Sequence, residues 1–86
     1  MEFLQTWIQG IKDARVQRGL DFAKKIAERH KYMEPYNEFE TAIRQCQRGD
    51  CPYTVSELRT MSNKISPGME CVGIVWDAAD AVGNKN

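Results

Sequence analysis

The segment YNEFETAIRQC constrains the fold most, because its apolar side chains recur with the period of an α-helix. Pro35 precedes the segment and suits the first position of a helix, and Gly49 follows it and suits the end of one. The pattern therefore predicts an amphipathic helix over about 35–48. Its apolar face is formed by Tyr36, Phe39, Ala42, Ile43 and Cys46.

A second helix is predicted after a short turn. In the sequence TVSE, the Thr54 hydroxyl can accept from the backbone amide of Glu57, while the Glu57 carboxylate can accept from the amide of Thr54, which is a capping box. The apolar residues that follow share one helix face, so we predict a helix over about 55–65. Pro67 then disfavours helical backbone at Ser66, and the chain must turn there. The apolar face consists of Val55, Leu58, Met61 and Ile65.

The last part of the chain predicts another helix, over about 67–82. Pro67 suits its start and Gly83 its end, and we expect residues 83–86 to fray into solvent. The segment CVGIVW has the composition of a strand, but a sheet needs a partner strand, and the sequence offers no second candidate. The apolar residues at helical spacing are Val72, Val75, Trp76, Ala79 and Val82.

The first third carries two apolar stripes, which are rotated by roughly 120° from each other at about 100° per residue. Either the helix breaks near Gly19 and Asp21 starts a new one, giving helices over about 2–18 and 21–32, or one long helix shows different faces to different neighbours. The first stripe is Phe3, Leu4, Trp7, Ile8, Ile11 and Ala14, and the second is Val16, Leu20, Ala23, Ile26, Ala27 and His30.

Together these elements predict an all-α fold, a compact bundle of four to five short helices. The 86 residues are enough for one domain, which we expect to cover 1–86. Twelve basic and twelve acidic residues cancel, so we expect no nucleic-acid partner, because nucleic-acid binders carry a basic excess. The basic residues concentrate in the first 33 positions and the acidic ones in the rest, which leaves self-association open.

The sequence also bears on location. No segment approaches the roughly 18 consecutive apolar residues of a membrane span. The N-terminus MEFLQTWIQGIKDAR lacks the basic region, the apolar run and the cleavage site of a signal peptide. We therefore expect a cytoplasmic protein without a transmembrane segment.

Three cysteines and one histidine raise the question of a metal or redox site. Cys46 and Cys51 are separated by four residues, whereas structural zinc sites use two close ligand pairs and redox motifs use C-x-x-C. Cys71 and His30 are isolated in the sequence. An odd number of cysteines without an export signal fits reduced thiols. We expect no metal, no cofactor, and two reduced thiols at a helix–helix turn, where Cys51 has no evident role.

Catalytic patterns are equally weak. His30 has no orienting partner at a characteristic spacing, and a general base needs one. Asp77 and Asp80 lie on the less apolar face of the last predicted helix, where carboxylates serve to solvate it. SPGMECVG matches neither phosphate-binding loop pattern. We therefore expect a protein that is not an enzyme, and a small metal- or thiol-dependent enzyme is the less favoured alternative.

The surface residues point instead to binding of another protein. The first apolar stripe resembles a groove-binding or interfacial helix, in which Trp7 would be an anchor, although such a stripe can also pack into a core. The basic run that contains Lys24 and Lys25 could dock an acidic partner or a membrane surface. The predicted partner-binding residues are Phe3, Leu4, Trp7, Ile8, Ile11, Lys24 and Lys25.

The segments IQGIKDARVQRGLDFA and SPGMECVGIVWDAAD, together with the overall length, resemble the small cytoplasmic lysis-inhibition accessory proteins (antiholins) of T-even-type phages. The resemblance implies a helical, non-enzymatic protein that binds the cytosolic part of a holin and delays lysis of the host cell. It implies no role for individual residues. The alternative is another phage- or plasmid-type inhibitor or adaptor of a host protein or nucleic-acid complex.

Overall fold

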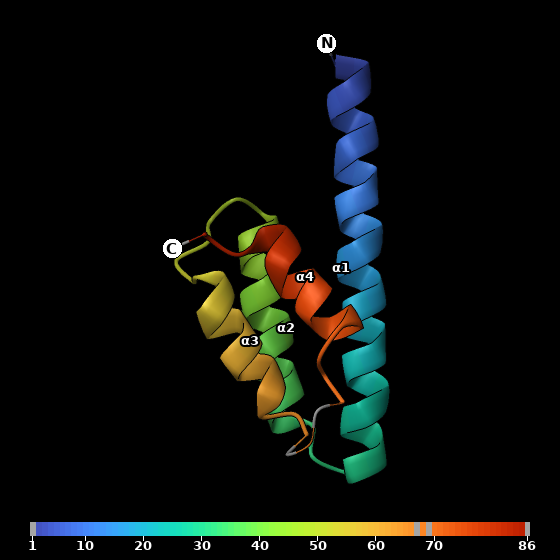
Figure 1. The fold of residues 1–86 in the computed structure, drawn as a ribbon, viewed down its shortest axis with the longest axis vertical. Coiled ribbons are helices and arrows are strands. Elements are labelled where there is room, and N and C mark those ends of the chain that lie inside the picture. Colours follow the sequence, from blue (N-terminus) through green and yellow to red (C-terminus); the bar gives the residue numbers. More distant parts are fainter. Residues whose placement is uncertain (1, 67, 69, 86) are drawn as a thin grey trace.

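The computed structural model describes residues 2–66, 68 and 70–85, and the side chains of the first helix from Gly10 onward. Four helices follow one another along the chain (Figure 1): α1 (Glu2–His30), α2 (Glu34–Gln47), α3 (Val55–Asn63) and α4 (Ile74–Val82). Within the described residues there is no strand. The predicted all-α fold is confirmed.

The first helix is continuous, so the alternative of one long helix is confirmed and the division into helices over 2–18 and 21–32 is wrong. Gly19 does not break α1, because it is the point where α4 crosses closely. A Cβ at Gly19 would lie 2.6 Å from the Cβ of Ala78 and 3.0 Å from the carbonyl oxygen of Ile74. The absence of a side chain therefore allows the two helices to pack, and this packing offsets the roughly 1 kcal/mol that glycine costs in a helix.

The predicted helix over 35–48 is confirmed to within one residue at each end. All five residues of its apolar face are buried. Gly49, with a φ of 97°, ends it as predicted. The amide of Gly49 donates to Cys46 and that of Asp50 to Gln45, a C-terminal motif that needs left-handed backbone at the glycine position.

The predicted capping box starts α3. The Glu57 amide donates to Thr54 Oγ1 at 3.1 Å, and the Thr54 amide donates to Glu57 Oε1 at 3.0 Å. The helix ends at Asn63, two residues before the predicted end, although Ile65 is still buried against the core.

The last helix is shorter than predicted: it begins at Ile74 and not at 67. Gly73 precedes it with a φ of 91°, so the described residues between Glu70 and Gly73 form turns. Pro67, the expected start, lies outside the described residues. The segment CVGIVW is turn and helix, which rules out the strand alternative. Gly83 ends α4 as predicted.

Asn84, the second residue after α4, is held by hydrogen bonds, contrary to the expectation of fraying. The Asn84 amide donates to Tyr53 O at 3.0 Å, and Asn84 O accepts from the Val55 amide at 2.9 Å. The Asn84 side chain also donates to Cys51 O at 2.6 Å. These bonds hold the end of the chain against the α2–α3 connection.

The core lies between the second half of α1 and the other three helices. Among the α1 residues from Gly10 onward, the first buried one is Val16, and Gly10–Arg15 are all exposed. Figure 1 shows α1 running well past the other helices at its N-terminal end. The second apolar stripe is buried as far as Ala27, but His30, expected at its end, is exposed. The buried residues of that stripe are Val16, Leu20, Ala23, Ile26 and Ala27.

Candidate functional site

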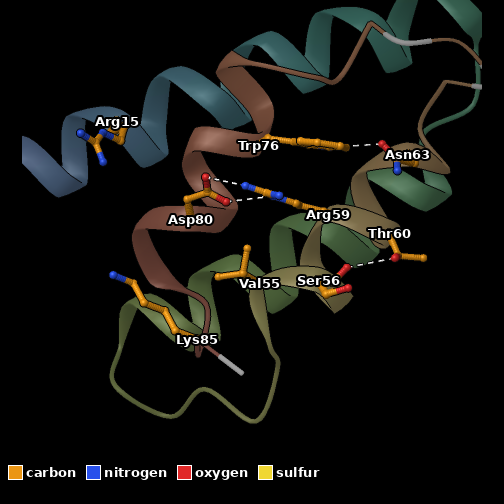
Figure 2. Close-up of a pocket in the computed structure, with 9 residues that line it drawn as sticks. All are labelled: Arg15, Val55, Ser56, Arg59, Thr60, Asn63, Trp76, Asp80 and Lys85. Carbon is orange, nitrogen blue, oxygen red and sulfur yellow. Dashed lines mark hydrogen bonds and ion pairs between the residues drawn. The ribbon is translucent and has the colours of Figure 1, made fainter.

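An open groove of about 910 Å³ lies between α3, α4 and the exposed part of α1 (Figure 2). Its volume falls within the roughly 300–1,000 Å³ of typical ligand pockets, although this groove is open along the surface. Four elements line it, counting the segment after α4. The lining residues are Arg15, Val55, Ser56, Arg59, Thr60, Asn63, Trp76, Asp80 and Lys85.

Arg59 joins the two walls of the groove. Its Nε donates to Asp80 Oδ1 at 3.0 Å and its Nη2 to Asp80 Oδ2 at 2.7 Å, a two-point contact between α3 and α4. Hydrogen bonding to Asp80 raises the pKa of Arg59, and the nearby Asp77 adds to the effect. The guanidinium also stacks over the Trp76 ring, 4.6 Å from its centroid. Arg59 is therefore held in one orientation.

Trp76 is fixed from its other end as well. Its Nε1 donates to Asn63 Oδ1 at 3.2 Å, so the ring spans from α4 to the end of α3. Because Trp76 and Asp80 are four residues apart on α4, they share one helix face and meet Arg59 together. The middle of the groove is thus built in advance of any ligand.

Two further cations flank this centre. Arg15 approaches from α1, and Lys85 follows the segment that Asn84 ties to the α2–α3 connection. Both side chains are exposed, and neither has an acidic partner in the described part of the chain. Asp80 is already engaged by Arg59. The lining therefore carries an excess of positive charge that no lining residue neutralises.

The structure places the predicted partner-binding residues in two separate regions. Phe3, Leu4, Trp7 and Ile8 lie on the first turns of α1, and their side chains are outside the described residues. Ile11 is 45% exposed. It precedes Arg15 by one turn, so the two share a helix face that leads into the groove. Lys24 and Lys25 are exposed on the packed half of α1 and do not line the groove.

Nine positions separate Lys24 from Arg15, which at about 100° per residue puts the two side chains on opposite faces of α1. Ile11 thus lies one turn from a residue that lines the groove, Arg15, whereas Lys24 and Lys25 do not line it.

Sequence reasoning missed most of the groove. It placed Trp76 in an apolar stripe and gave Asp80 the role of solvating the last helix. The spacing of these two residues was a usable signal, because residues four apart on a helix share a face. The involvement of Arg59, Arg15 and Lys85 had no such signal, since each comes from another element.

The two cysteines at the turn form a disulfide, so the expectation of two reduced thiols is wrong. The left-handed turn at Gly49 folds the chain back and brings the Cα atoms of Cys46 and Cys51 to 3.9 Å. The expectation of reduced thiols placed both cysteines at this turn but gave more weight to the odd number of cysteines and to the compartment than to the short distance that the turn creates. Cys51, which had no evident role, closes the α2–α3 connection, with its Sγ 3.4 Å from the carbonyl oxygens of Tyr53 and Val82.

The disulfide also removes two of the four side chains considered for zinc, since bonded sulfurs are not thiolate ligands. In the described ranges, no cluster of three or more His, Cys, Asp or Glu residues could hold a metal. Burial raises the pKa of the remaining thiol, Cys71, and the Glu70 carboxylate adds to the effect. A thiol in that state remains protonated and is a poor nucleophile.

His30 belongs to a polar cluster at the other end of the molecule. Its Nε2 lies 3.0 Å from Glu70 Oε2, Ser66 Oγ donates to the same oxygen at 2.6 Å, and Arg29 Nη1 donates to Glu70 Oε1 at 3.0 Å. The Ser66 and His30 hydrogen bonds, in that order, lower the pKa of Glu70. Because the glutamate stands between the serine and the histidine, the imidazole cannot take the serine proton. The cluster ties the end of α1 to the segment before α4.

Comparison with known proteins adds no relative. No family model matches the chain, and neither the curated proteins nor the solved structures yield a significant match. In the described part of the chain, no helix combines the length and the apolar character that crossing a membrane requires.

Proposed function

We propose that the protein is a non-enzymatic regulatory protein that acts by binding another protein. The single observation that carries the proposal is the unpacked N-terminal part of α1, in which Gly10–Arg15 are all exposed while the same helix is deeply packed from Val16 onward. We name the segment from the first turn of α1 to Arg15 the projecting segment.

The projecting segment reaches the groove at Arg15, which is one of the lining residues. Ile11 contributes exposed apolar area, Arg15 links it to the groove, and Trp76 with Arg59 lies in the groove itself. Tryptophan and arginine are enriched among the residues that dominate binding energy at protein interfaces. This mixture of apolar and charged groups supports recognition of a folded or extended protein partner.

The resemblance to antiholins suggests a specific partner, the cytosolic part of a holin, and a specific effect, delayed lysis of the host cell. We propose this as the particular form of the function. The general form, binding of a protein partner through the projecting segment, does not depend on it.

The test measures binding of purified full-length protein to the purified cytosolic part of a holin from the same phage. Ile11→Asp places a charge on the proposed surface and is expected to weaken binding at least tenfold. Val72→Asp is the matched control, because Val72 is 38% exposed and lies away from the groove. Equal affinities of the two variants would contradict the proposed surface.

If no holin binds, a partner captured from host extract is purified and measured with the same two variants. Failure to reconstitute binding with any purified partner would contradict the general proposal as well.

We propose a cytoplasmic location for the protein. Fractionation of host cells followed by immunoblotting is expected to recover it together with a cytoplasmic marker protein. Because disulfides persist mainly in oxidising compartments, the Cys46–Cys51 bond makes the periplasm the location to compare. Recovery of the protein with a periplasmic marker would contradict the cytoplasmic location.

A further inference from the structure

We propose that the groove of Arg15, Arg59, Trp76 and Lys85 binds an acidic peptide segment, with carboxylates at the cations and an apolar side chain beside Trp76. This inference rests on the proposed function in that it names the chemistry of the partner, and it makes a claim about a site that can be tested separately.

The first step is charge. Arg15, Arg59 and Lys85 reach the groove from α1, α3 and the segment after α4, and Asp80 is the single acidic residue among the lining residues. Since Asp80 is occupied by Arg59, the two flanking cations remain available to a ligand. Carboxylates of a ligand could form ion pairs with Arg15 and Lys85, which have no such partner among the described residues.

The second step is orientation. Asp80 takes the Nε and Nη2 side of the Arg59 guanidinium, and Trp76 covers one of its faces. The Nη1 group has no hydrogen-bond partner among the described residues and is held in place by these contacts. A fixed guanidinium donor loses little freedom when it binds a carboxylate, which favours affinity.

The third step is the apolar contribution. Val55 and Trp76 line the same groove and are partly exposed. A single carboxylate ion would leave these side chains and most of the 910 Å³ unfilled. A peptide segment that alternates acidic and apolar residues would use both kinds of lining.

The same geometry disfavours nucleic acid. Bases bind single-strand sites by stacking on aromatic rings, but one face of Trp76 is already covered by Arg59 and its Nε1 is bonded to Asn63. Asp80 lies in the groove, so a phosphate backbone that followed the groove would meet its carboxylate.

The experiment uses full-length protein and a fluorescein-labelled peptide made of alternating Glu and Leu, followed by fluorescence anisotropy. Trp7→Phe leaves Trp76 as the remaining tryptophan, so its emission reports directly on the groove. The double variant Arg15→Gln, Lys85→Gln is expected to weaken binding about tenfold, which corresponds to two exposed ion pairs. Binding is also expected to weaken with added salt.

The matched control is Lys31→Gln, Arg48→Gln, which removes one lysine and one arginine from exposed positions outside the groove. It is expected to change the affinity less than twofold. Circular dichroism melting checks that both double variants fold, as their exposed side chains predict. Equal weakening in the two double variants, no binding of the acidic peptide, or tighter binding of a single-stranded oligonucleotide or of inorganic phosphate would each overturn the inference.

Failure of this inference is distinguishable from failure of the proposed function. If a purified protein partner binds and Ile11→Asp weakens it while Arg15→Gln, Lys85→Gln does not, the groove inference is wrong and the proposed function stands. If the acidic peptide binds as expected but no protein partner can be reconstituted, the groove is a ligand site and the proposed function is wrong.

Discussion

The two halves of α1 belong to one uninterrupted helix and yet have opposite environments. From Gly10 to Arg15 each residue is exposed, whereas from Val16 onward a regular apolar stripe is completely buried. The boundary lies about one turn before Gly19, where α4 packs tightly against α1 through Ala78 and Ile74. The difference shows that a continuous helix does not imply a continuous core, because burial begins only where a second helix lies against it.

The packed half is also held at its far end. Arg29 and His30 contact Glu70, which comes from the segment before α4. The exposed half makes a polar contact with α2, in which Gln47 Nε2 donates to Asp13 Oδ1 at 3.0 Å, but its described side chains do not enter the core. One half of α1 thus packs in the core, and the other contacts the fold at its surface.

The largest expected difference in stability is between alanine variants of Leu20 and Ile11. Leu20→Ala is expected to lower the free energy of unfolding by about 3 kcal/mol, because it removes a fully buried side chain and leaves a cavity. Ile11→Ala is expected to change it by no more than about 0.5 kcal/mol, as for other exposed positions. Urea denaturation measures both. A comparable loss in Ile11→Ala would mean that the projecting segment is packed in solution.

A smaller change in stability, of opposite sign in the two halves of α1, is expected when each of its two glycines is replaced by alanine. Gly10→Ala is expected to stabilise the protein by up to about 1 kcal/mol, because a Cβ there meets nothing within 4 Å and alanine favours helix. Gly19→Ala is expected to destabilise it by about 1 kcal/mol, since the crowding against Ala78 costs more than the helix propensity returns. Thermal melting of the two variants checks the signs, and stabilisation by both would show that α4 does not press on Gly19.

The smallest effect concerns the contact that anchors the end of α1. The hydrogen bonds from Ser66 and His30 lower the pKa of Glu70 below its usual 4.5 in the folded protein. The carboxylate therefore stabilises the fold above pH 4.5, and the stabilisation is lost as the pH falls through the lowered value. Glu70→Gln is expected to lower the melting temperature slightly at neutral pH and to match the wild type in acid.

The control for this prediction is Glu38→Gln, because Glu38 is exposed and makes no ion pair or hydrogen bond among the described residues. If Glu70→Gln lowers the melting temperature by the same amount at low pH, the carboxylate charge does not hold the end of α1 to the segment before α4.

The sequence predicted helix boundaries correctly where residues a few positions apart determine them. The Thr54–Glu57 capping box and the left-handed stop at Gly49 appear as predicted, because each depends on residues a few positions apart. The prediction placed the start of the last helix too early, since Gly73 takes a positive φ that a helix does not allow. The disulfide was not predicted. The turn at Gly49 was expected, but the short distance that it creates between Cys46 and Cys51 was not taken into account.

The candidate groove depended on contacts that no local pattern contains. Arg59 meets Asp80 across 21 positions of sequence, and Arg15 joins them from a different helix. Such contacts follow from how the helices cross, and periodicity within one helix does not specify the crossing.

By itself, the sequence determined that the protein is all-α, the position of α2, the start of α3 and the end of α4, and which face of α2 is buried, because hydrogen bonding and apolar spacing within a segment decide these features. Only the tertiary structure decided that Gly19 is a contact and not a break, that Ile11 is exposed while Leu20 is buried, and that Arg15, Arg59 and Lys85 line one groove. Each of these depends on a neighbour that is distant in sequence, and the position of that neighbour is set by packing of the whole chain.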